Sequence, residues 1–365
     1  MNTAKHNIKV LVAPLDWGLG HATRCIPLIT TLLSLGYEVI LAGEGAQAAL
    51  LQSEFPQLVI LPLKGYRVTY SKHRWIFPLK ILFQLPYIWR SIQEENQWLK
   101  EQVKAHSIRL IVSDNRYGLH HPGIPSIFIT HQLCVQAPFR WMEKWIQKIQ
   151  YRQIQFFTEC WVPDAAGITN AAGKLSHPEK LPPIPTRYIG WLCRLKSLPQ
   201  NPTFLYKYCI VLSGPEPQRS CLEKILLAQL GNQTEQILFI RGLPDVNELP
   251  VIPSHITCYN HLNQKDLSVA FSQSEWIVSR SGYTTLMEIL CLQKKSILIP
   301  TPGQTEQIYL AKKLQEQNLA FSASQEKLDW QKTIREAAAF SYQFGEKSIF
   351  QPSQLSSYLK NLMVE

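Results

Sequence analysis

The hydrophobic pattern of the chain alternates between short apolar runs and amphipathic segments. Residues 8–14 and 37–42 are apolar runs of strand length. Between them, Ile26, Ile29 and Leu33 recur at helical spacing, so this region predicts a strand, a helix and a second, parallel strand. Similar units recur through the rest of the chain, which predicts an α/β protein built on parallel sheets.

The length of the chain indicates more than one hydrophobic core. A chain of 365 residues is expected to form two domains of roughly 150 to 190 residues each. The stiff, proline-rich stretch 178–185 has few periodic apolar positions, which is typical of a connection between domains. We therefore predict one domain over residues 1–190, a second over 191–343, and a tail over 344–365 that packs back on the first domain.

Composition narrows the class of protein. Hydrophobic residues make up 45% of the chain and charged residues 18%, which is typical of a folded globular protein. The eight cysteines form no C-x-x-C pair and have no His-rich metal-binding spacing, so we expect reduced thiols and no metal. No apolar run has the pattern of a secretory signal or the length of a membrane span, so we expect a cytoplasmic protein.

The basic excess is concentrated where aromatic residues are also frequent. Lys and Arg total 37 against 27 acidic residues, a formal net charge of +10. Basic and aromatic residues interleave over Lys64–Trp89, and Pro78 and Pro86 exclude a spanning helix there. Such a mixture favours peripheral contact with an anionic membrane surface, here the inner face of the cell membrane. A similar mixture recurs over residues 139–152.

Two other interpretations of the basic-aromatic regions stay open. Nucleic-acid binding also uses such surfaces, but no recognisable nucleic-acid-binding module accompanies them, so we expect no nucleic acid as partner. The aromatic residues could equally belong to the core, with the lysines solvated around them.

A turn in the second half of the chain has the features of an anion site. The apolar run 275–278 leads into Ser279–Gly282, and residues 285–290 continue with helical periodicity. The first amides of such a helix lack internal partners and carry the positive end of its dipole, so a phosphate is favoured there. A further strand, 296–300, brings the polar loop 301–307 to the same edge of the sheet.

The position of Glu288 makes this predicted anion site suitable for a nucleotide. Ser281, Thr284 and Glu288 have helical spacing, and Glu288 lies about 10 Å along the axis from Ser281 at roughly 1.5 Å per residue. A diphosphate at the helix start would then place a ribose near the carboxylate, which can accept from both ribose hydroxyls. The alternative is structural, because parallel α/β sheets commonly contain such turns and a helical glutamate is usually solvated.

Polar residues also follow the strands of the first half. The loop of residues 15–21 is not a dinucleotide fingerprint, because Thr23 occupies the place of the third glycine. His21, at the start of the helix, is a candidate base or anion donor, with helix capping as the structural alternative. Asp114 ends one strand and is a second candidate base. His131 follows another strand and is a candidate for binding an acceptor substrate or a phosphate.

Together these motifs resemble the GT-B glycosyltransferases, and most of all family 28, the group of the lipid II N-acetylglucosaminyltransferase and the diacylglycerol galactosyltransferases. The resemblance implies two Rossmann-like domains facing a central cleft. It also implies that Glu288 holds the ribose, that Gly282 and its neighbours hold the diphosphate, and that the main chain near Leu262 reads the uracil edge. Gly18–His21 resembles the glycine-rich acceptor loop of the group.

Two departures from the family pattern and one further resemblance limit what the family resemblance implies. Residues 213–215 read Ser-Gly-Pro where the family usually has Gly-Gly-Ser, so Pro215 removes a backbone donor. Glu306 follows Gln304, a shifted order that leaves the identity of the donor sugar undefined. The loop 20–25 is also similar to that of a nucleotide-sugar hydrolase of the same fold.

The resulting hypothesis is an inverting, metal-independent transfer of a hexosyl or N-acetylhexosaminyl group from a UDP-sugar to an acceptor, favoured to be a lipid. His21 is the first choice for the base and Asp114 the second, with Arg280 or Arg241 near the leaving group; no cofactor is expected. The predicted donor-binding residues are Ser213, Gly214, Arg241, Leu262, Arg280, Ser281, Gly282, Tyr283, Thr284, Glu288, Gln304, Glu306 and Gln307, and the predicted acceptor-side residues are Gly18, Gly20 and His131. A hydrolase and a non-catalytic membrane or scaffold subunit are the alternatives.

Overall fold

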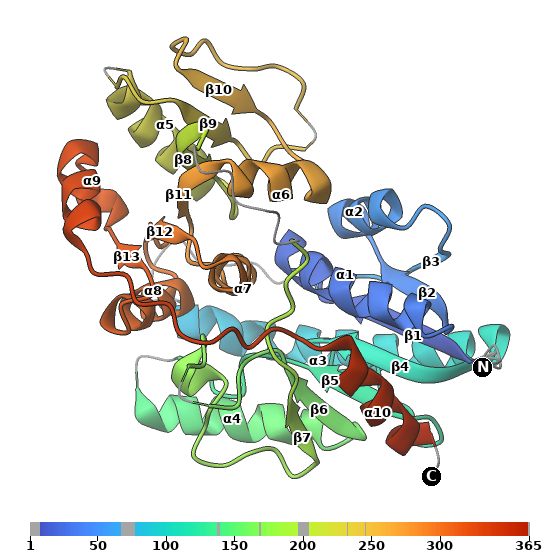
Figure 1. The fold of residues 1–365 in the computed structure, drawn as a ribbon. Coiled ribbons are helices and arrows are strands. Elements are labelled where there is room, and N and C mark those ends of the chain that lie inside the picture. Colours follow the sequence, from blue (N-terminus) through green and yellow to red (C-terminus); the bar gives the residue numbers. More distant parts are fainter. Residues whose placement is uncertain are drawn as a thin grey trace. The chain divides into compact units, whose positions relative to one another are not determined.

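The chain divides into two compact units. The computed structural model describes residues 8–66, 77–136, 139–167, 169–195, 204–231, 233–244 and 246–363, and it describes the side chains of these residues except 77–85 and 363. Unit 1 consists of Met1–Leu192 and Ser348–Glu365, and unit 2 of Cys193–Lys347. Each unit is a parallel sheet flanked by helices (Figure 1).

The described strands of unit 1 form one sheet in the order β3-β2-β1-β4-β5-β6-β7, and every pair runs parallel. The strands are β1 (Lys9–Pro14), β2 (Glu38–Gly43), β3 (Ile60–Pro62), β4 (Ile108–Asp114), β5 (Ser126–Ile129), β6 (Glu159–Val162) and β7 (Thr186–Tyr188). The strand order reverses between β1 and β4. In open parallel sheets, the ligand crevice lies at such a switch point, outside the carboxyl ends of the strands.

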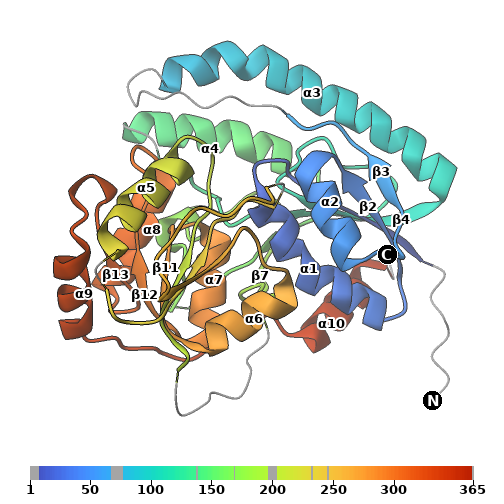
Figure 2. The same ribbon diagram turned by 90° about the horizontal axis from the view of Figure 1, so that it is seen from above.

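Helices cover both faces of this sheet. They are α1 (Leu19–Ser34), α2 (Gly45–Glu54), α3 (Phe77–His106), α4 (Arg140–Ile154) and α10 (Pro352–Met363), with a 3-10 turn at Gly173–Leu175. Leu99 of α3 and Ile154 of α4 pack on one face, where Figure 2 shows both helices. On the other face, Tyr358 of α10 packs against Trp161, with ring centroids 6.1 Å apart. The C-terminal segment is therefore part of unit 1.

Unit 2 repeats the design with the strand order β10-β9-β8-β11-β12-β13, again parallel throughout the described strands. The strands are β8 (Tyr206–Val211), β9 (Ile237–Ile240), β10 (Ile256–Tyr259), β11 (Ser274–Ser279), β12 (Lys295–Leu298) and β13 (Phe321–Ser322). Here the order reverses between β8 and β11. The switch point therefore lies at the loop after β8 and at the turn that the sequence predicts as an anion site.

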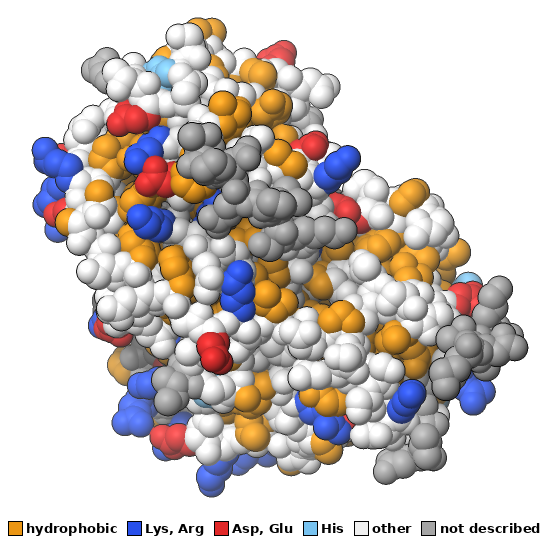
Figure 3. Space-filling model, in the orientation of Figure 1, with side chains coloured by type: hydrophobic (Ala, Val, Ile, Leu, Met, Phe, Trp, Pro, Cys, Tyr) orange, Lys and Arg blue, Asp and Glu red, His pale blue; other side chains and the backbone are white. Residues whose placement is uncertain are grey.

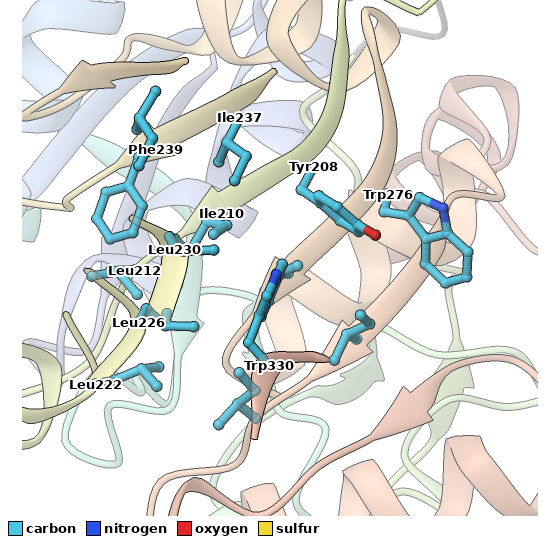
Figure 4. Packing of buried hydrophobic residues seen from close by; sticks show 14 of the residues in the cluster. Tyr208, Ile210, Leu212, Leu222, Leu226, Leu230, Ile237, Phe239, Trp276 and Trp330 are labelled. Carbon is cyan, nitrogen blue, oxygen red and sulfur yellow. The ribbon is translucent and has the colours of Figure 1, made fainter. Parts of the chain in front are cut away.

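One hydrophobic core cluster of unit 2 lies between this sheet and two of its helices. The helices are α5 (Gln218–Leu230), α6 (Gln264–Ser272), α7 (Tyr283–Leu292), α8 (Thr305–Glu316) and α9 (Trp330–Ala339), with a 3-10 turn at Gln325–Lys327. Leu226 of α5 and Trp330 of α9 pack on one face of the sheet (Figure 4). Trp330 meets Tyr208 edge to face, with ring centroids 5.1 Å apart. Two such units confirm the predicted pair of Rossmann-like α/β domains.

The predicted membrane-contact region Lys64–Trp89 lies largely outside the described residues. Residues 67–76 and the side chains of residues 77–85 are not among them. Of the described part, Tyr87 and Trp89 on α3 are exposed. Among the described helices, none is both long and apolar enough to cross a membrane.

Candidate functional site

In unit 1, three of the predicted polar residues converge at the carboxyl edge of the sheet. His21 lies in the first turn of α1, Asp114 ends β4, and His131 follows β5. Nδ1 of His21 lies 3.1 Å from Oδ2 of Asp114. Because β1 and β4 are neighbours at the switch point, the loops that follow them meet there.

Arg24 joins these three residues, although it was not among the predicted site residues. It lies one turn after His21 on α1 and is 2% exposed. Its Nε donates to Oδ2 of Asp114 at 2.8 Å, and Nη2 contacts Oδ1. Nη1 lies 3.0 Å from Nδ1 of His131, and Nη2 lies 2.8 Å from Nδ1 of His21. The i, i+3 spacing from His21 is the sequence signal that could have indicated Arg24.

Burial and the neighbouring charges shift the pKa values of Asp114 and His21 in this cluster. Burial alone would raise the pKa of Asp114, but Arg24 and His21 outweigh it and hold that pKa well below the usual range. Burial and the Arg24 charge lower the pKa of His21, against the opposing effect of Asp114. At neutral pH the imidazole is therefore uncharged and can accept a proton. Asp114 is a buried, ion-paired carboxylate, which makes it a poor base and a good partner for an imidazolium.

The predicted acceptor loop is held in place by neighbouring elements of unit 1. Gly18 is the N-cap of α1, and its carbonyl accepts from Nε2 of Gln47 at 2.7 Å. The carbonyl of Gly20 accepts from the Thr23 hydroxyl at 2.9 Å. Asp16, in the same loop, lies against Gly65. A Cβ at Gly65 would overlap the Asp16 carboxylate, so the close approach of the two segments depends on glycine. The loop before His21 is therefore ordered by contacts on both sides.

In unit 2, the turn after β11 leaves open space at the start of α7. Gly282 is the N-cap of α7, with no side-chain cap and no acidic residue in the first helical turn. A Cβ at Gly282 would meet no atom within 4 Å. Tyr283 and Thr284 form the first turn of α7. A helix N-terminus without acidic residues, next to open space, favours a bound anion.

Two loops at this edge of unit 2 are held together by Ser281 and Gln307. The Ser281 hydroxyl donates to the Gln307 carbonyl at 2.8 Å, and Oε1 of Gln307 accepts from the Thr301 amide at 2.9 Å. Gln307 is 6% exposed. Its amide oxygen therefore holds the Thr301 backbone, and its role as a donor-binding residue stays a prediction. Gln304, the N-cap of α8, and Glu306, in the first turn of that helix, are partly exposed.

Glu288 is buried on α7 and paired with an arginine that the sequence did not indicate. Nε of Arg194 donates to Oε1 of Glu288 at 2.8 Å. The Arg194 carbonyl accepts from Nε2 of Gln264 at 2.7 Å, which fixes this segment against α6. Among the described residues, no side chain pairs with Oε2 of Glu288. Arg194 is 94 positions from Glu288 along the chain, so no local motif could have found it.

The predicted role of Arg280 in stabilising a leaving group is not supported. Arg280 is 1% exposed, and its guanidinium donates to the carbonyls of Ile299 and Pro300 at 3.1 and 3.3 Å. It also donates to the Gln218 carbonyl at 2.7 Å. Burial lowers its pKa to about 10, so it stays charged at neutral pH. Its side chain ties the β11 turn to the segment that follows β12 and to the start of α5.

Arg241 has a comparable anchoring position after β9. Its Nε donates to Oε1 of Glu223 at 2.5 Å, and Nη1 donates to Oδ1 of Asn260 at 2.7 Å and to the Glu248 carbonyl at 3.0 Å. These bonds join Arg241 to α5, to the loop between β9 and β10 and to the residue that follows β10. Nε and Nη1 are therefore engaged within unit 2, and a contact between Arg241 and a leaving group stays a prediction. Leu262, between β10 and α6, is half-buried.

The loop after β8 lies beside a buried hydroxyl. Ser213 and Gly214 are exposed, and Gly214 has a φ of +96°, which suits glycine. A Cβ at Gly214 would lie 4.0 Å from Oγ1 of Thr301. That hydroxyl has no hydrogen-bond partner among the described residues. Thr301 therefore joins the residues whose polar atoms could contact a ligand at this edge.

The described side chains give no metal site. No group of three or more His, Cys, Asp or Glu residues in the described ranges could hold a metal ion.

Comparisons with known proteins support the family resemblance and establish the fold. Residues 218–357 match the sequence model of the glycosyltransferase family 28 C-terminal domain. The glycosyltransferase SnogD from Streptomyces nogalater is 14% identical, with a TM-score of 0.62 over 98% of this chain and 100% of that one. MurG from Acinetobacter baumannii is 13% identical, with a TM-score of 0.57 over 97% and 99%.

A third structure, the glycosyltransferase SsfS6 from Streptomyces sp. SF2575, was solved in complex with thymidine diphosphate. It is 12% identical, with a TM-score of 0.59 over 97% of this chain and 100% of that one. No curated protein sequence matches the chain. The chain has the GT-B fold, and the family match together with this fold supports sugar transfer as the general activity.

Proposed function

We propose that the protein is an inverting glycosyltransferase that moves a sugar from a UDP-sugar to an acceptor bound by unit 1. The observation that carries this proposal is the His21–Asp114 pair at the switch point of unit 1, in a chain whose second unit matches a glycosyltransferase family. A neutral imidazole beside a buried, charged carboxylate is suited to take the proton of an acceptor hydroxyl.

The proposed base is His21, acting through Nε2. This requires the tautomer in which Nδ1–H donates to Oδ2 of Asp114 and Nη2 of Arg24 donates to Oδ1 of Asp114 instead of to Nδ1. The Nε2 lone pair is then available to the acceptor. As the acceptor oxygen attacks the anomeric carbon, its proton passes to Nε2. The charge of Asp114 then stabilises the imidazolium, while Arg24 holds Asp114 in position. The bond to the nucleoside diphosphate breaks on the opposite side of the anomeric carbon, which inverts its configuration.

The proposed donor site uses the start of α7 and Glu288. Main-chain amides beside Gly282 would bind the diphosphate, and the helix dipole would offset the charge on the leaving group without a metal. Oε2 of Glu288 would accept from the ribose, while Arg194 orients the carboxylate through Oε1. The thymidine diphosphate bound to SsfS6 supports a nucleoside diphosphate as ligand of this fold.

The experiment that tests the donor site combines a change in the protein with a change in the ligand. Calorimetry should measure binding of UDP and of 2′-deoxy-UDP, without metal, to the wild-type protein and to Glu288→Ala. A hydrogen bond to a charged group contributes roughly 1.5 to 3 kcal/mol, so the wild-type protein should bind 2′-deoxy-UDP at least about tenfold more weakly than UDP. Glu288→Ala should bind both weakly and equally.

The matched control is Glu316→Ala, which removes an exposed glutamate paired with Lys312 on α8. It should bind both nucleotides as the wild-type protein does. Equal affinity of the wild-type protein for the two nucleotides would contradict the ribose contact. Release of UDP and free sugar at the same rate with and without acceptor would instead assign hydrolysis to the same site.

A further inference from the structure

Helix α4 has an unusual distribution of side chains. Its outer face consists of Trp141, Lys144, Trp145, Lys148 and Arg152, which are all exposed and spaced to form one stripe along the helix. Trp141 is 67% exposed and Trp145 is 45% exposed. A helix that only packs on a core turns its largest apolar side chains inward. Here the two tryptophans face outward.

The inner face of α4 carries Ile154, which packs in the core of unit 1, and two buried glutamines. Gln150 and Gln153 are buried, and Nε2 of Gln150 donates to the Gln132 carbonyl at 2.5 Å. Nε2 of Gln147 donates to the Leu133 carbonyl at 3.2 Å. Packing of α4 on unit 1 therefore does not account for its tryptophans. It does tie α4 to the loop that follows β5.

The outer face has no partner in the described part of the chain. No described residue forms a hydrogen bond or ion pair with the three basic side chains of the stripe. Helix α4 carries four basic residues and one acidic residue. Figure 3 shows Lys and Arg side chains gathered along the lower edge of the molecule, where Figure 1 places α4.

An exposed phenylalanine lies at each end of α4. Phe139, the N-cap residue, is 56% exposed, and its ring stacks on Trp141 with centroids 6.3 Å apart. Phe156, just beyond the other end, is 53% exposed. Single exposed apolar residues are common, but a row of aromatic rings bordered by cations on one helix is not.

We propose that the outer face of α4 docks on an anionic lipid bilayer. Indole rings suit the boundary between headgroups and acyl chains, because they combine an apolar body with one polar N–H. The stripe of Lys144, Lys148 and Arg152 matches the charge of anionic headgroups. Helix α4 thus lies in the plane of the interface, with the face that carries Gln150, Gln153 and Ile154 toward unit 1.

This docking also indicates the class of acceptor, a step that rests on the proposed function. The carbonyls held by Gln147 and Gln150 belong to the residues that directly follow His131, and His131 contacts Arg24 of the proposed catalytic cluster. Docking through α4 therefore brings the loop after β5 close to the headgroups. An acceptor with a lipid tail would keep the tail in the bilayer and present its hydroxyl at this edge of unit 1.

Flotation with lipid vesicles tests the docking surface directly. The purified full-length protein should float with phosphatidylcholine vesicles that contain phosphatidylglycerol and remain unbound with phosphatidylcholine alone. Each basic side chain near an anionic surface contributes about fivefold to partitioning. Lys144→Glu/Lys148→Glu should therefore bind at least about 25-fold more weakly. Trp141→Ala/Trp145→Ala should reduce vesicle binding both in low-salt and in high-salt buffer, because salt does not screen the insertion of indole rings.

Two control variants separate α4 from general effects of charge and exposed apolar area. Lys312→Glu/Lys332→Glu makes the same charge change on α8 and α9, and Leu249→Ala/Val251→Ala removes exposed apolar side chains of unit 2. Both should float like the wild-type protein. Thermal unfolding should be unchanged in all four variants, because every substituted side chain is exposed.

The outcomes distinguish this proposal from the proposed function. If α4 variants float like the wild-type protein, or if the wild-type protein does not float, the docking surface is refuted. Loss of binding to a single-stranded oligonucleotide in the α4 variants, without flotation of the wild-type protein, would assign the surface to nucleic acid instead. UDP binding should be unaffected by any α4 variant. Flotation without UDP binding would leave the docking surface standing and remove the proposed function.

Discussion

Replacing Asp114 with asparagine should destabilise unit 1 far more than loss of a surface ion pair. The carboxylate is fully buried, accepts from Nε of Arg24 at 2.8 Å and lies 3.1 Å from Nδ1 of His21. Asparagine would leave the guanidinium of Arg24, itself 2% exposed, without a counter-charge. Removing one partner of a buried ion pair costs about 3 to 5 kcal/mol, because the other charge stays desolvated.

The size of the effect can be measured by thermal unfolding. For domains of about 150 to 250 residues, 1 kcal/mol shifts Tm by roughly 2 to 4 °C, so Asp114→Asn should lower the Tm of unit 1 by about 6 to 20 °C. Differential scanning calorimetry should be used, because it can resolve the transitions of two units. Urea unfolding of the same variant should give the 3 to 5 kcal/mol directly.

A matched control is Glu94→Gln on α3. It removes the carboxylate of an exposed i, i+4 pair with Arg90, at an N–O distance of 2.8 Å. Exposed pairs contribute about 0 to 1 kcal/mol, so Tm should change by less than about 4 °C. If Asp114→Asn unfolds within a degree or two of Glu94→Gln, the reasoning is refuted. Asp114 would then not be the charge that compensates Arg24.

Three further predictions concern the His21–Asp114 pair of unit 1 and the Arg194–Glu288 pair of unit 2. First, the free energy of unfolding should fall on acidification in two steps. Below about pH 6.5 the unfolded state binds a proton at His21 before the folded state does, because folding lowers the pKa of His21. Below about pH 4 the same holds for Asp114, whose pKa is also lowered by folding, so the stability that its ion pair contributes is lost. Urea unfolding of Asp114→Asn as a function of pH should lack the second step. Second, His21→Gln should reduce kcat by about 100-fold or more while UDP affinity in calorimetry stays unchanged; weakened UDP binding would contradict a base confined to the acceptor side. Third, Arg194→Ala should weaken UDP binding about tenfold by releasing Glu288, with partial rescue in Arg194→Lys; tighter binding would show that Arg194 competes with the ribose.

The fold was predictable because burial imposes a repeating pattern. Parallel strands covered on both faces read as short apolar runs, and the helices between them keep one apolar stripe. The meeting of His21, Asp114 and His131 was also predictable in outline. Each follows a strand, and parallel strands bring their carboxyl ends to one edge of the sheet. Hydrophobic periodicity and strand direction together carry this information, without any knowledge of side-chain contacts.

The directions of long side chains were not predictable. Arg280 stands in the predicted anion turn, yet its guanidinium points inward to three backbone carbonyls. Arg24 looked like an ordinary helical arginine, yet it is buried against Asp114. Both outcomes depend on which polar partner lies within reach of a flexible side chain once the sheet has formed. That partner is set by tertiary structure, as is the pairing of Arg194 with Glu288 from 94 positions away.

The distribution of charge in unit 1 relates the proposed catalytic cluster to the proposed docking surface. Its buried arginines are each matched by an acid: Arg24 by Asp114, and Arg116 by Glu95. Such matching is required, because an unpaired buried guanidinium costs several kcal/mol, on the order of a domain's whole stability. The basic side chains of α4 that have no acidic partner among the described residues, Lys144, Lys148 and Arg152, are accordingly exposed. Because they line up beside outward-facing tryptophans on α4, we expect their charge to act at long range and to draw that face toward an anionic surface.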